Sequence, residues 1–214
     1  MHKRLPRMAA WVDMLVVDLG LLRLPVNRPE EVVPGVWRSN QPAPWRLKRL
    51  ADQGFHSVLN LRGESQSGSF HLERHYCEQY GLGLTSVRLS SRRPPQIDRL
   101  LQVVNTLNQA PKPLLLHCKS GADRAGLIAA IAVLLAGEDV NLARTQLSLK
   151  YFHIKQASTG MMDHVIETYI KAHAETGVTF QEWVTHEYDP AKVAASFHSS
   201  GLLTFLVDRV LRRE

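Results

Sequence analysis

The sequence is poor in cysteine and has no long apolar run. Only two cysteines, Cys77 and Cys118, occur among its 214 residues, which argues against a secreted fold built on several disulfides and favours a reducing compartment. Asp13 and Asp18 interrupt the apolar stretch near the N-terminus, and no small-residue cleavage site follows it, so it does not fit a signal peptide. No other segment approaches the length of a membrane span. We therefore expect a cytoplasmic protein.

Internal repeats, low-complexity tracts and basic runs interleaved with aromatic residues are also missing. The formal net charge of +6 still favours anionic partners. Because no basic and aromatic run is present, nucleic acid is not an expected partner. The histidines do not show the spacing of metal ligands, and we expect neither a metal nor another cofactor. The length fits one well-packed domain.

Hydrophobic periodicity predicts an α/β fold. Strands are expected at residues 36–39, 57–61, 84–89 and 114–117. Helices are expected at residues 8–22, 44–53, 71–80, 97–109, 124–136, 140–152, 160–173, 179–187 and 200–213. Strands that alternate with helices, followed by a helical C-terminal third, indicate a mainly parallel sheet of four to five strands flanked by helices.

Residues 114–126, LLLHCKSGADRAG, carry the strongest functional signal in the chain. An apolar strand leads into Cys118, a tight loop follows, and a helix opens near Arg124. This order aims backbone N–H groups, a helix N-terminus and a guanidinium at one point in front of the sulfur, as in an anion site. Gly121 permits a backbone geometry that a side chain would obstruct. The predicted anion-binding residues are Lys119, Ser120, Gly121, Ala122, Asp123 and Arg124.

Phosphoryl transfer is the chemistry that these residue types support. A thiol with a pKa of about 8.5 is mostly protonated at neutral pH, and a helix N-terminus, amides and a nearby cation favour its reactive thiolate form. The planar guanidinium of Arg124 matches two phosphate oxygens, and inward-facing N–H groups can bind the equatorial oxygens of the transition state. Cys118 is therefore the candidate nucleophile. A buried structural cysteine is the alternative.

HCKSGADRAG resembles the signature loop H-C-x5-R of the cysteine-dependent protein tyrosine and dual-specificity phosphatases. VWRSNQP at 36–42 and VLNLRGE at 58–64 resemble strand segments of the compact bacterial and atypical dual-specificity members. The resemblance implies hydrolysis of phosphomonoesters, carried by a protein or by an inositol or lipid. It also implies a phosphocysteine intermediate at Cys118 and a phosphoryl group held by Arg124.

The resemblance covers about residues 32–172 and implies the phosphotyrosine phosphatase fold. We expect a single phosphatase domain over 1–214, with flanking helices at 8–22 and 174–214. The tail 201–214 combines leucines with arginines, as does an interfacial helix on an anionic membrane. Packing of the terminal helices on the domain is the favoured interpretation. Peripheral contact with the inner face of the membrane is the alternative.

The family supplies its general acid from an aspartate on a loop before the helix that precedes the signature. Asp98 is the only Asp or Glu between Leu82 and Cys118, so it is the expected acid. A helix-start carboxylate favoured by the macrodipole is the alternative role for Asp98. Asp123 and Glu64 are the other candidates for the acid.

Ala125 departs from the family pattern, because most members place Ser or Thr after the arginine, where it helps to stabilise the departing thiolate. A slow second step follows, and a phosphate-binding module with slow turnover becomes an alternative function. Gln156 is a candidate for positioning the hydrolytic water. A rhodanese-like sulfurtransferase, which also places a cysteine at the head of an anion-binding loop, is the second enzyme class.

Other polar residues are assigned supporting roles near the loop. His117 is expected to orient it through hydrogen bonds. Arg38, Arg62 and the pair at 92–93 lie at or just beyond the carboxyl ends of predicted strands, where ligands of parallel sheets bind. They are candidates for contact with a second phosphate or an anionic head group. Lys119 resembles the lysine of inositol-phosphate-directed members, although protein-directed members also carry it.

Overall fold

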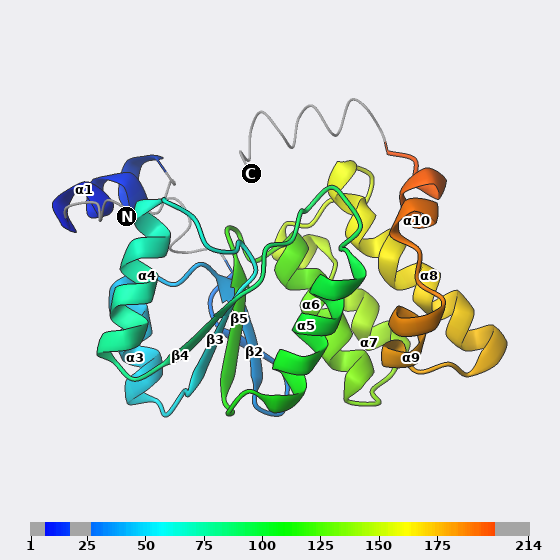
Figure 1. Ribbon diagram of the computed structural model, residues 1–214, viewed down its shortest axis with the longest axis horizontal. Helices are drawn as coiled ribbons and strands as arrows, with labels where there is room; N and C mark the ends of the chain where they lie inside the picture. Colours follow the sequence, from blue (N-terminus) through cyan, green and yellow to red (C-terminus); the bar gives the residue numbers. More distant parts are fainter. Residues whose placement is uncertain (1–6, 18–26, 200–214) are drawn as a thin grey trace.

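The computed structural model describes residues 7–17 and 27–199. A five-stranded sheet lies between two layers of helices (Figure 1). Its strands are β1 (Glu30–Val33), β2 (Val36–Asn40), β3 (Ser57–Asn60), β4 (Gly83–Ser86) and β5 (Leu114–Cys118). They are ordered β1-β2-β5-β3-β4, and only β1 runs antiparallel to its neighbour. The predicted α/β class and mainly parallel sheet are confirmed, and β1 is an additional strand at the edge.

Strand β5 occupies the centre of the sheet because every one of its residues is apolar or has a buried partner. Leu115 faces the layer formed by α3 (Pro44–Asp52) and α4 (Gly68–Gln79), where it packs in one cluster with Leu47 and Cys77. Leu114 and Leu116 belong to the cluster on the opposite face. This alternation follows from the two-residue repeat of a strand. The same alternation determines which face of the sheet each of the last side chains of β5 points to.

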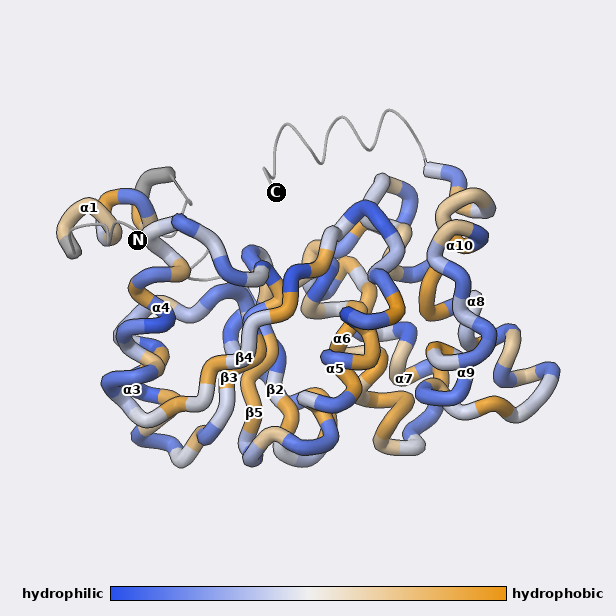
Figure 2. Tube along the Cα trace, viewed as in Figure 1, coloured by the Kyte–Doolittle hydropathy of each residue, from blue (hydrophilic) through white to orange (hydrophobic). Residues whose placement is uncertain are grey.

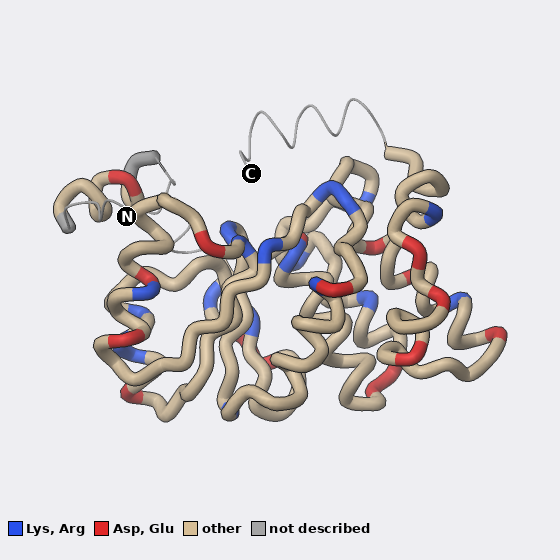
Figure 3. The backbone as a smooth tube through the Cα atoms, in the orientation of Figure 1, with Lys and Arg blue, Asp and Glu red and all other residues tan. Residues whose placement is uncertain are grey.

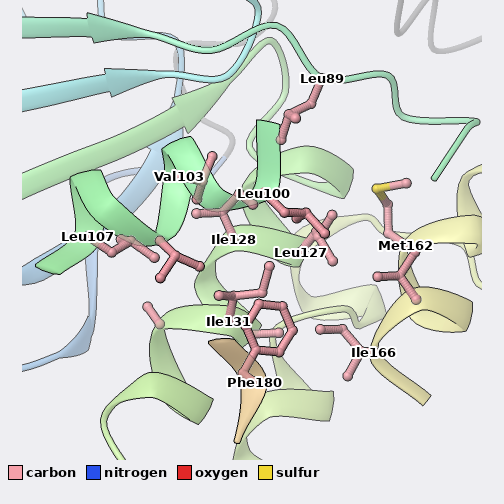
Figure 4. Close-up of a cluster of buried hydrophobic side chains, with 14 of the residues drawn as sticks. Leu89, Leu100, Val103, Leu107, Leu127, Ile128, Ile131, Met162, Ile166 and Phe180 are labelled. Carbon is pink, nitrogen blue, oxygen red and sulfur yellow. The ribbon is translucent and has the colours of Figure 1, made fainter. Parts of the chain in front are cut away.

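The second layer contains α5 (Ile97–Gln109), α6 (Asp123–Leu135), α8 (Met161–Thr176) and α9 (Phe180–His186). Helix α6 is buried on nearly every side, and Leu127, Ile128 and Ile131 pack between α5 and α8 (Figure 4). Apolar residues accordingly concentrate along the middle of the molecule (Figure 2). A helix that is apolar all round must be enclosed by other elements, so the start of α6 is held rigidly.

The helix predicted at 140–152 is wrong in its second half. The structure has α7 (Val140–Thr145) followed by a separate 3-10 turn, Leu149–Tyr151. Gln146, the residue after α7, uses its carbonyl to accept a hydrogen bond from Arg38. Helix α10 (Pro190–Ser196) was not predicted from the sequence.

Residues 7–17, near the N-terminus, form two consecutive helical segments. They are α1 (Arg7–Val12) and a π-helical turn, Asp13–Val17. The rest of the predicted helix 8–22 and the predicted helix 200–213 lie outside the described residues. Among the residues that the structure describes, no helix is long and apolar enough to cross a membrane.

Candidate active site

The signature loop connects the end of β5 to the start of α6. Cys118 is the last residue of β5 and only 1 % of its surface is exposed. The backbone N–H of Gly121 donates a hydrogen bond to Cys118 Sγ across 3.2 Å. Gly121 has a φ of +78°, and a Cβ atom there would lie 2.7 Å from the backbone nitrogen of Asn40. Only glycine satisfies both the positive φ and the close packing on β2, so this residue brings an N–H group to the sulfur.

Arg38 holds the loop from below. Its Nη2 donates to the carbonyl oxygens of Gly121 at 2.7 Å and Ala122 at 3.3 Å, and its Nη1 donates to the Gln146 carbonyl at 2.7 Å. The guanidinium stacks 3.6 Å from the ring centre of Tyr151. Burial lowers the pKa of Arg38 to about 10, so the side chain is still charged at neutral pH. Arg38 thus binds the carbonyl oxygens of Gly121 and Ala122, while the N–H of Gly121 is directed at the sulfur.

This position corrects the role predicted for Arg38. The side chain is buried and its donors are directed at backbone carbonyls of the protein. It does not reach the rim where a second phosphate or a head group would bind. Arg38 acts instead as a structural support of the loop.

His117 is supported by a buried carboxylate from α4. Its Nε2 lies 2.6 Å from Glu73 Oε1, and neither side chain is exposed. Glu73 Oε2 accepts a hydrogen bond of 2.8 Å from Asn60 Nδ2, and Asn60 Oδ1 accepts one of 2.7 Å from the backbone N–H of Arg62. Glu73 therefore connects the end of β5 to the end of β3.

A second buried histidine supports the helix side of the loop. His153 Nδ1 lies 2.7 Å from Asp123 Oδ1, and its Nε2 lies 2.5 Å from Asp163 Oδ2. Burial opposes the charged imidazolium, but the hydrogen bonds and charges of the two carboxylates outweigh it and raise the pKa of His153. Asp123 immediately precedes Arg124, so this bridge ties the first turn of α6 to α8.

A hollow of about 360 Å³ lies above the loop. Its lining residues are mostly cationic or hydroxyl-bearing, namely Arg62, Ser65, Arg88, Leu89, Ser90, Lys119 and Arg124. Arg124 Nη1 donates to the Leu89 carbonyl across 3.4 Å. Lys and Arg residues gather in this region, where the loops leave the upper edge of the sheet (Figure 3). Among the described residues, four cations and no carboxylate line the hollow, so it is suited to a small, strongly anionic group.

The structure does not bring Asp98 to this hollow. The Asp98 side chain is 71 % exposed, lies 3.4 Å from Arg99 Nε, and lines a different hollow with Thr85 and Gln102. The prediction of Asp98 as the general acid is therefore not supported by its position. Its place in the first turn of α5 fits the helix-start role instead.

The other two candidate acids differ in position. Asp123 is buried against His153, which leaves it poorly placed to give a proton to a substrate. Glu64 is exposed beside the hollow: its carbonyl oxygen accepts a hydrogen bond from Arg88, and Ser65 follows it in the lining. Of the three carboxylates, Glu64 is the one that is exposed and adjacent in sequence to a residue of the lining.

The remaining predicted site residues divide into those near the hollow and those away from it. Arg62 and Lys119 line it, as predicted for supporting and binding residues. The Ser120 carbonyl accepts a hydrogen bond of 2.7 Å from Asn27, which fixes the loop from the side of β2. Gln156 is exposed and is not among the lining residues. Ala125 is fully buried in α6.

Cys77 packs on the opposite face of the sheet from the cluster that contains Cys118. Burial raises the pKa of the Cys77 thiol well above its usual range. Both features are those of a buried structural cysteine.

Sequence reasoning missed Glu73, Asp163 and Arg88. Glu73 lies four residues before the buried Cys77 and three after Phe70, and Asp163 lies three before Ile166, so both occupy apolar faces of their helices. A carboxylate on an apolar face is a signal of a buried ion pair, because an unpaired charge is too costly to bury. Arg88 had no comparable signal.

A family profile described as "DSP-PTPase phosphatase fused to NAD+ Kinase" matches residues 25–162, more than half of the chain. The chain belongs to this family. It is a cysteine-dependent phosphatase-family protein of the tyrosine and dual-specificity superfamily, as the signature loop predicted. A search of the curated proteins gives no match.

Solved structures of phosphatases share the fold at low identity. The catalytic core of the PP-IP phosphatase SIW14 from S. cerevisiae aligns with a TM-score of 0.54 and 20% identity, over 70% of this chain and 91% of that one. A DUF442 phosphatase from Shewanella putrefaciens CN-32 gives 0.52 and 16%, over 70% and 95%. TpbA from P. aeruginosa gives 0.50 and 16%, over 79% and 90%. These likenesses establish the phosphatase fold.

Proposed function

We propose that this protein hydrolyses phosphomonoesters through a phosphocysteine intermediate. The Cys118 thiolate attacks phosphorus and forms the S–P bond while the ester P–O bond breaks. Arg124 and the loop N–H groups bind the three equatorial oxygens. Water then attacks the phosphocysteine, the S–P bond breaks, and inorganic phosphate leaves with the thiolate restored.

The observation that carries this proposal is the arrangement of the signature loop. A backbone N–H group donates to the sulfur, Arg38 draws the loop carbonyls away, and Arg124 lines the hollow above. The N-terminus of α6 adds its positive end to the same site. Preorganised donors of this kind stabilise the charge of a phosphoryl transition state without reorganisation.

Glu64 is our candidate for the group that protonates the leaving oxygen. Ser65, the next residue, lines the hollow, whereas Asp98 lines a different one and Asp123 is paired with His153. A Glu64→Gln variant should lose more activity on an alkyl phosphate than on an aryl phosphate, since a good leaving group needs little protonation. Equal losses on both substrates would remove Glu64 from this role.

A compact substrate with concentrated negative charge fits the rim best. Arg62, Arg88 and Lys119 lie around Arg124 and no carboxylate lines the hollow. An inositol or lipid phosphate meets these cations more fully than a single phosphorylated side chain, and the yeast protein of similar fold is named a PP-IP phosphatase. Phosphopeptides, inositol phosphates and phospholipids assayed side by side test this preference.

The decisive experiment is hydrolysis of an aryl phosphate with chelator in excess. We expect activity in the native chain and loss of about a thousandfold or more in Cys118→Ser, because the serine hydroxyl is a poor nucleophile without a base. Rapid quenching of the native enzyme should trap a protein heavier by one phosphoryl group. Undiminished turnover by Cys118→Ser would refute the mechanism.

Ala125 motivates a second candidate function, a phosphate-binding module with slow turnover. Its side chain is buried at the start of α6 and provides no hydroxyl for the departing thiolate. Ala125→Ser should then increase steady-state turnover without changing the pre-steady-state burst.

For the sulfurtransferase alternative, transfer of sulfur from thiosulfate to cyanide is the discriminating assay.

We place this activity in the cytoplasm, where a reducing environment keeps the Cys118 thiol free. Both cysteines are unpaired in the structure. Peripheral contact with the inner face of the membrane through the terminal helices is a further proposal, and the tail 201–214 lies outside the described residues. Fractionation of cells that express the tagged chain tests both assignments.

A further inference from the structure

A second hollow, of about 610 Å³, lies beside α3, and the proposed reaction does not use it. We call it the α3 hollow. Among the residues that the structure describes, its lining comes from α3, the residue after it and the segment before β1: Arg28, Pro29, Trp45, Arg46, Arg49, Leu50 and Gln53. None of them is acidic, and none lines the hollow at Arg124. The two hollows are therefore separate sites.

Three guanidinium groups meet in the α3 hollow. Burial lowers the pKa of Arg46, and the positive charges of Arg28 and Arg49 lower it further. Bringing like charges together at the edge of a protein costs free energy, and an anion placed among them reverses the sign of that interaction. Guanidinium groups present planar pairs of donors that match phosphate oxygens.

An aromatic surface borders the same hollow. Trp45 is 50 % exposed, and its ring stacks on Trp11 of α1 with centroids 6.1 Å apart. On α1, Met8 and Val12 are 84 % and 60 % exposed. A half-exposed indole offers an apolar face to the part of a ligand that carries no charge. The lining therefore suits a ligand with phosphate at one end and a planar or apolar group at the other.

We propose that the α3 hollow binds the phosphate group of a phosphate ester whose uncharged part packs on Trp45. Two sources share this chemistry, a soluble nucleotide and the head group of an anionic phospholipid. The site is outside the catalytic hollow, and it does not depend on the hydrolytic activity proposed above.

The α3 hollow has a direct connection to the signature loop. Arg46 Nη1 donates a hydrogen bond of 2.8 Å to Asn40 Oδ1. Asn40 is the register partner of Cys118, and its backbone nitrogen is the atom against which Gly121 packs. A ligand that repositions Arg46 thus acts on the strand end that supports the loop. For this reason Arg46 is left unchanged in the test.

The test compares Arg28→Gln/Arg49→Gln with the charge-matched control Lys48→Gln/Lys171→Gln, both in a Cys118→Ser background that prevents hydrolysis. Lys48 is on the same helix but pairs with Asp52, and Lys171 is on α8, so neither lines the hollow. Calorimetric titration with ADP should give two sites in the background and control proteins. In the test variant the second site should weaken at least tenfold, since charge-assisted hydrogen bonds are lost.

A parallel arm uses sedimentation with phosphatidylcholine vesicles, with and without phosphatidylglycerol. Loss of binding by the test variant in the ADP arm alone identifies a soluble ligand, and loss in the vesicle arm alone identifies a lipid head group. Loss in both supports the shared chemistry. If the test variant and the control behave alike in both arms, or if the unsubstituted background binds neither probe, the proposal is wrong.

A second measurement, tryptophan fluorescence, uses a substitution that leaves the charge of the protein unchanged. The bound probe should change the tryptophan fluorescence of the Cys118→Ser protein, and Trp45→Phe should remove most of that change. An unaltered response in Trp45→Phe would separate the ligand from the α3 hollow. Because every readout is binding, failure of this proposal is distinguishable from failure of the phosphatase mechanism, which is judged by turnover.

Discussion

The base and the rim of the catalytic hollow are built on opposite principles. At the base, buried polar side chains contact one another or the backbone: Arg38 binds loop carbonyls, His117 contacts Glu73, and His153 lies between two aspartates. At the rim, Arg62, Arg88 and Lys119 face an open hollow with no carboxylate in its lining. The base is held by contacts within the protein. The rim presents cationic side chains to the hollow, where Arg62 also donates to Gln41 and Arg88 to the Glu64 carbonyl.

This difference separates two ways in which a substitution can reduce activity. Loss of a base residue leaves buried polar groups without partners and disturbs the loop, so stability and kcat should fall together. Loss of a rim residue removes a contact with the substrate while the fold is unaffected, so KM should rise alone. The following substitutions test whether the base and the rim separate in this way.

Arg38→Met should have the largest effect, because three loop and helix-end carbonyls lose their donor at once. We expect kcat/KM to fall at least a hundredfold and the free energy of unfolding to fall by about 3 kcal/mol or more. Urea denaturation and steady-state kinetics measure both quantities. Arg38→Lys is the control, since it keeps the charge but not the paired donors. A kinetic loss without a stability loss would place Arg38 at the rim after all.

His153→Asn should be next, with kcat reduced about 10–100-fold as the first turn of α6 loses its anchor on α8. Asn can contact one aspartate but cannot bridge two. The KM for a soluble aryl phosphate should stay unchanged, which distinguishes a misplaced catalytic loop from weaker substrate binding. A variant with native kcat would show that Asp123 needs no partner to keep Arg124 in place.

The charge of His153 also predicts a pH dependence. Its pKa in the folded protein is raised above an unfolded value of about 6.5, so the protonated bridge stabilises the fold fully below that value. The stabilisation is lost as pH rises through the folded pKa. The groups that face the imidazole are Asp123 from α6 and Asp163 from α8, and Arg38 interacts with Asp123 through its charge. NMR titration of the imidazole measures the pKa, and unfolding curves at several pH values measure the stability. Asp163→Asn should lower the pKa of His153. A His153 pKa below 6.5 would contradict the bridge.

Glu73→Gln should produce a smaller change. The amide oxygen can still accept from Asn60, but the negative charge beside His117 is lost. We expect the free energy of unfolding to fall by about 1–2 kcal/mol and kcat to fall by less than in His153→Asn. Glu78→Gln, an exposed change on the same helix, is the control. Equal effects of the two substitutions would exclude a supporting role for Glu73.

The central strand and its loop were predictable because their signals are local. An apolar run of strand length, a glycine and a helix-forming run specify β5, the loop and α6 within residues 114–135. The anion site followed from the same segment, since the elements that build it are adjacent in sequence. The family resemblance extended the prediction to β2 and β3.

The supports of the base could not be assigned in the same way, because they come from distant segments. Glu73 and His117 are 44 residues apart in the sequence, and their contact depends on how α4 packs on the sheet. Arg38 looked like a rim residue because it is on a strand near the ligand edge, yet its side chain is buried beneath the loop. Asp98 was chosen because it is the only carboxylate between Leu82 and Cys118. That criterion says nothing about where its side chain points. Burial of charge and side-chain direction require the tertiary structure.

Arg88→Gln should have the smallest effect on the protein and a selective one on the substrate. The Arg88 side chain is exposed at the hollow, so the free energy of unfolding should change by about 0.5 kcal/mol or less. KM should rise about tenfold for a substrate with two phosphates and change little for an aryl phosphate, with kcat preserved. Raising the salt concentration should narrow the gap between the native and variant enzymes, because exposed charges are screened. Arg74→Gln, which removes a cation on α4 outside the hollow, is the matched control. If Arg88→Gln instead lowers kcat and stability together, the rim supports the fold as the base does, and the distinction between base and rim is wrong.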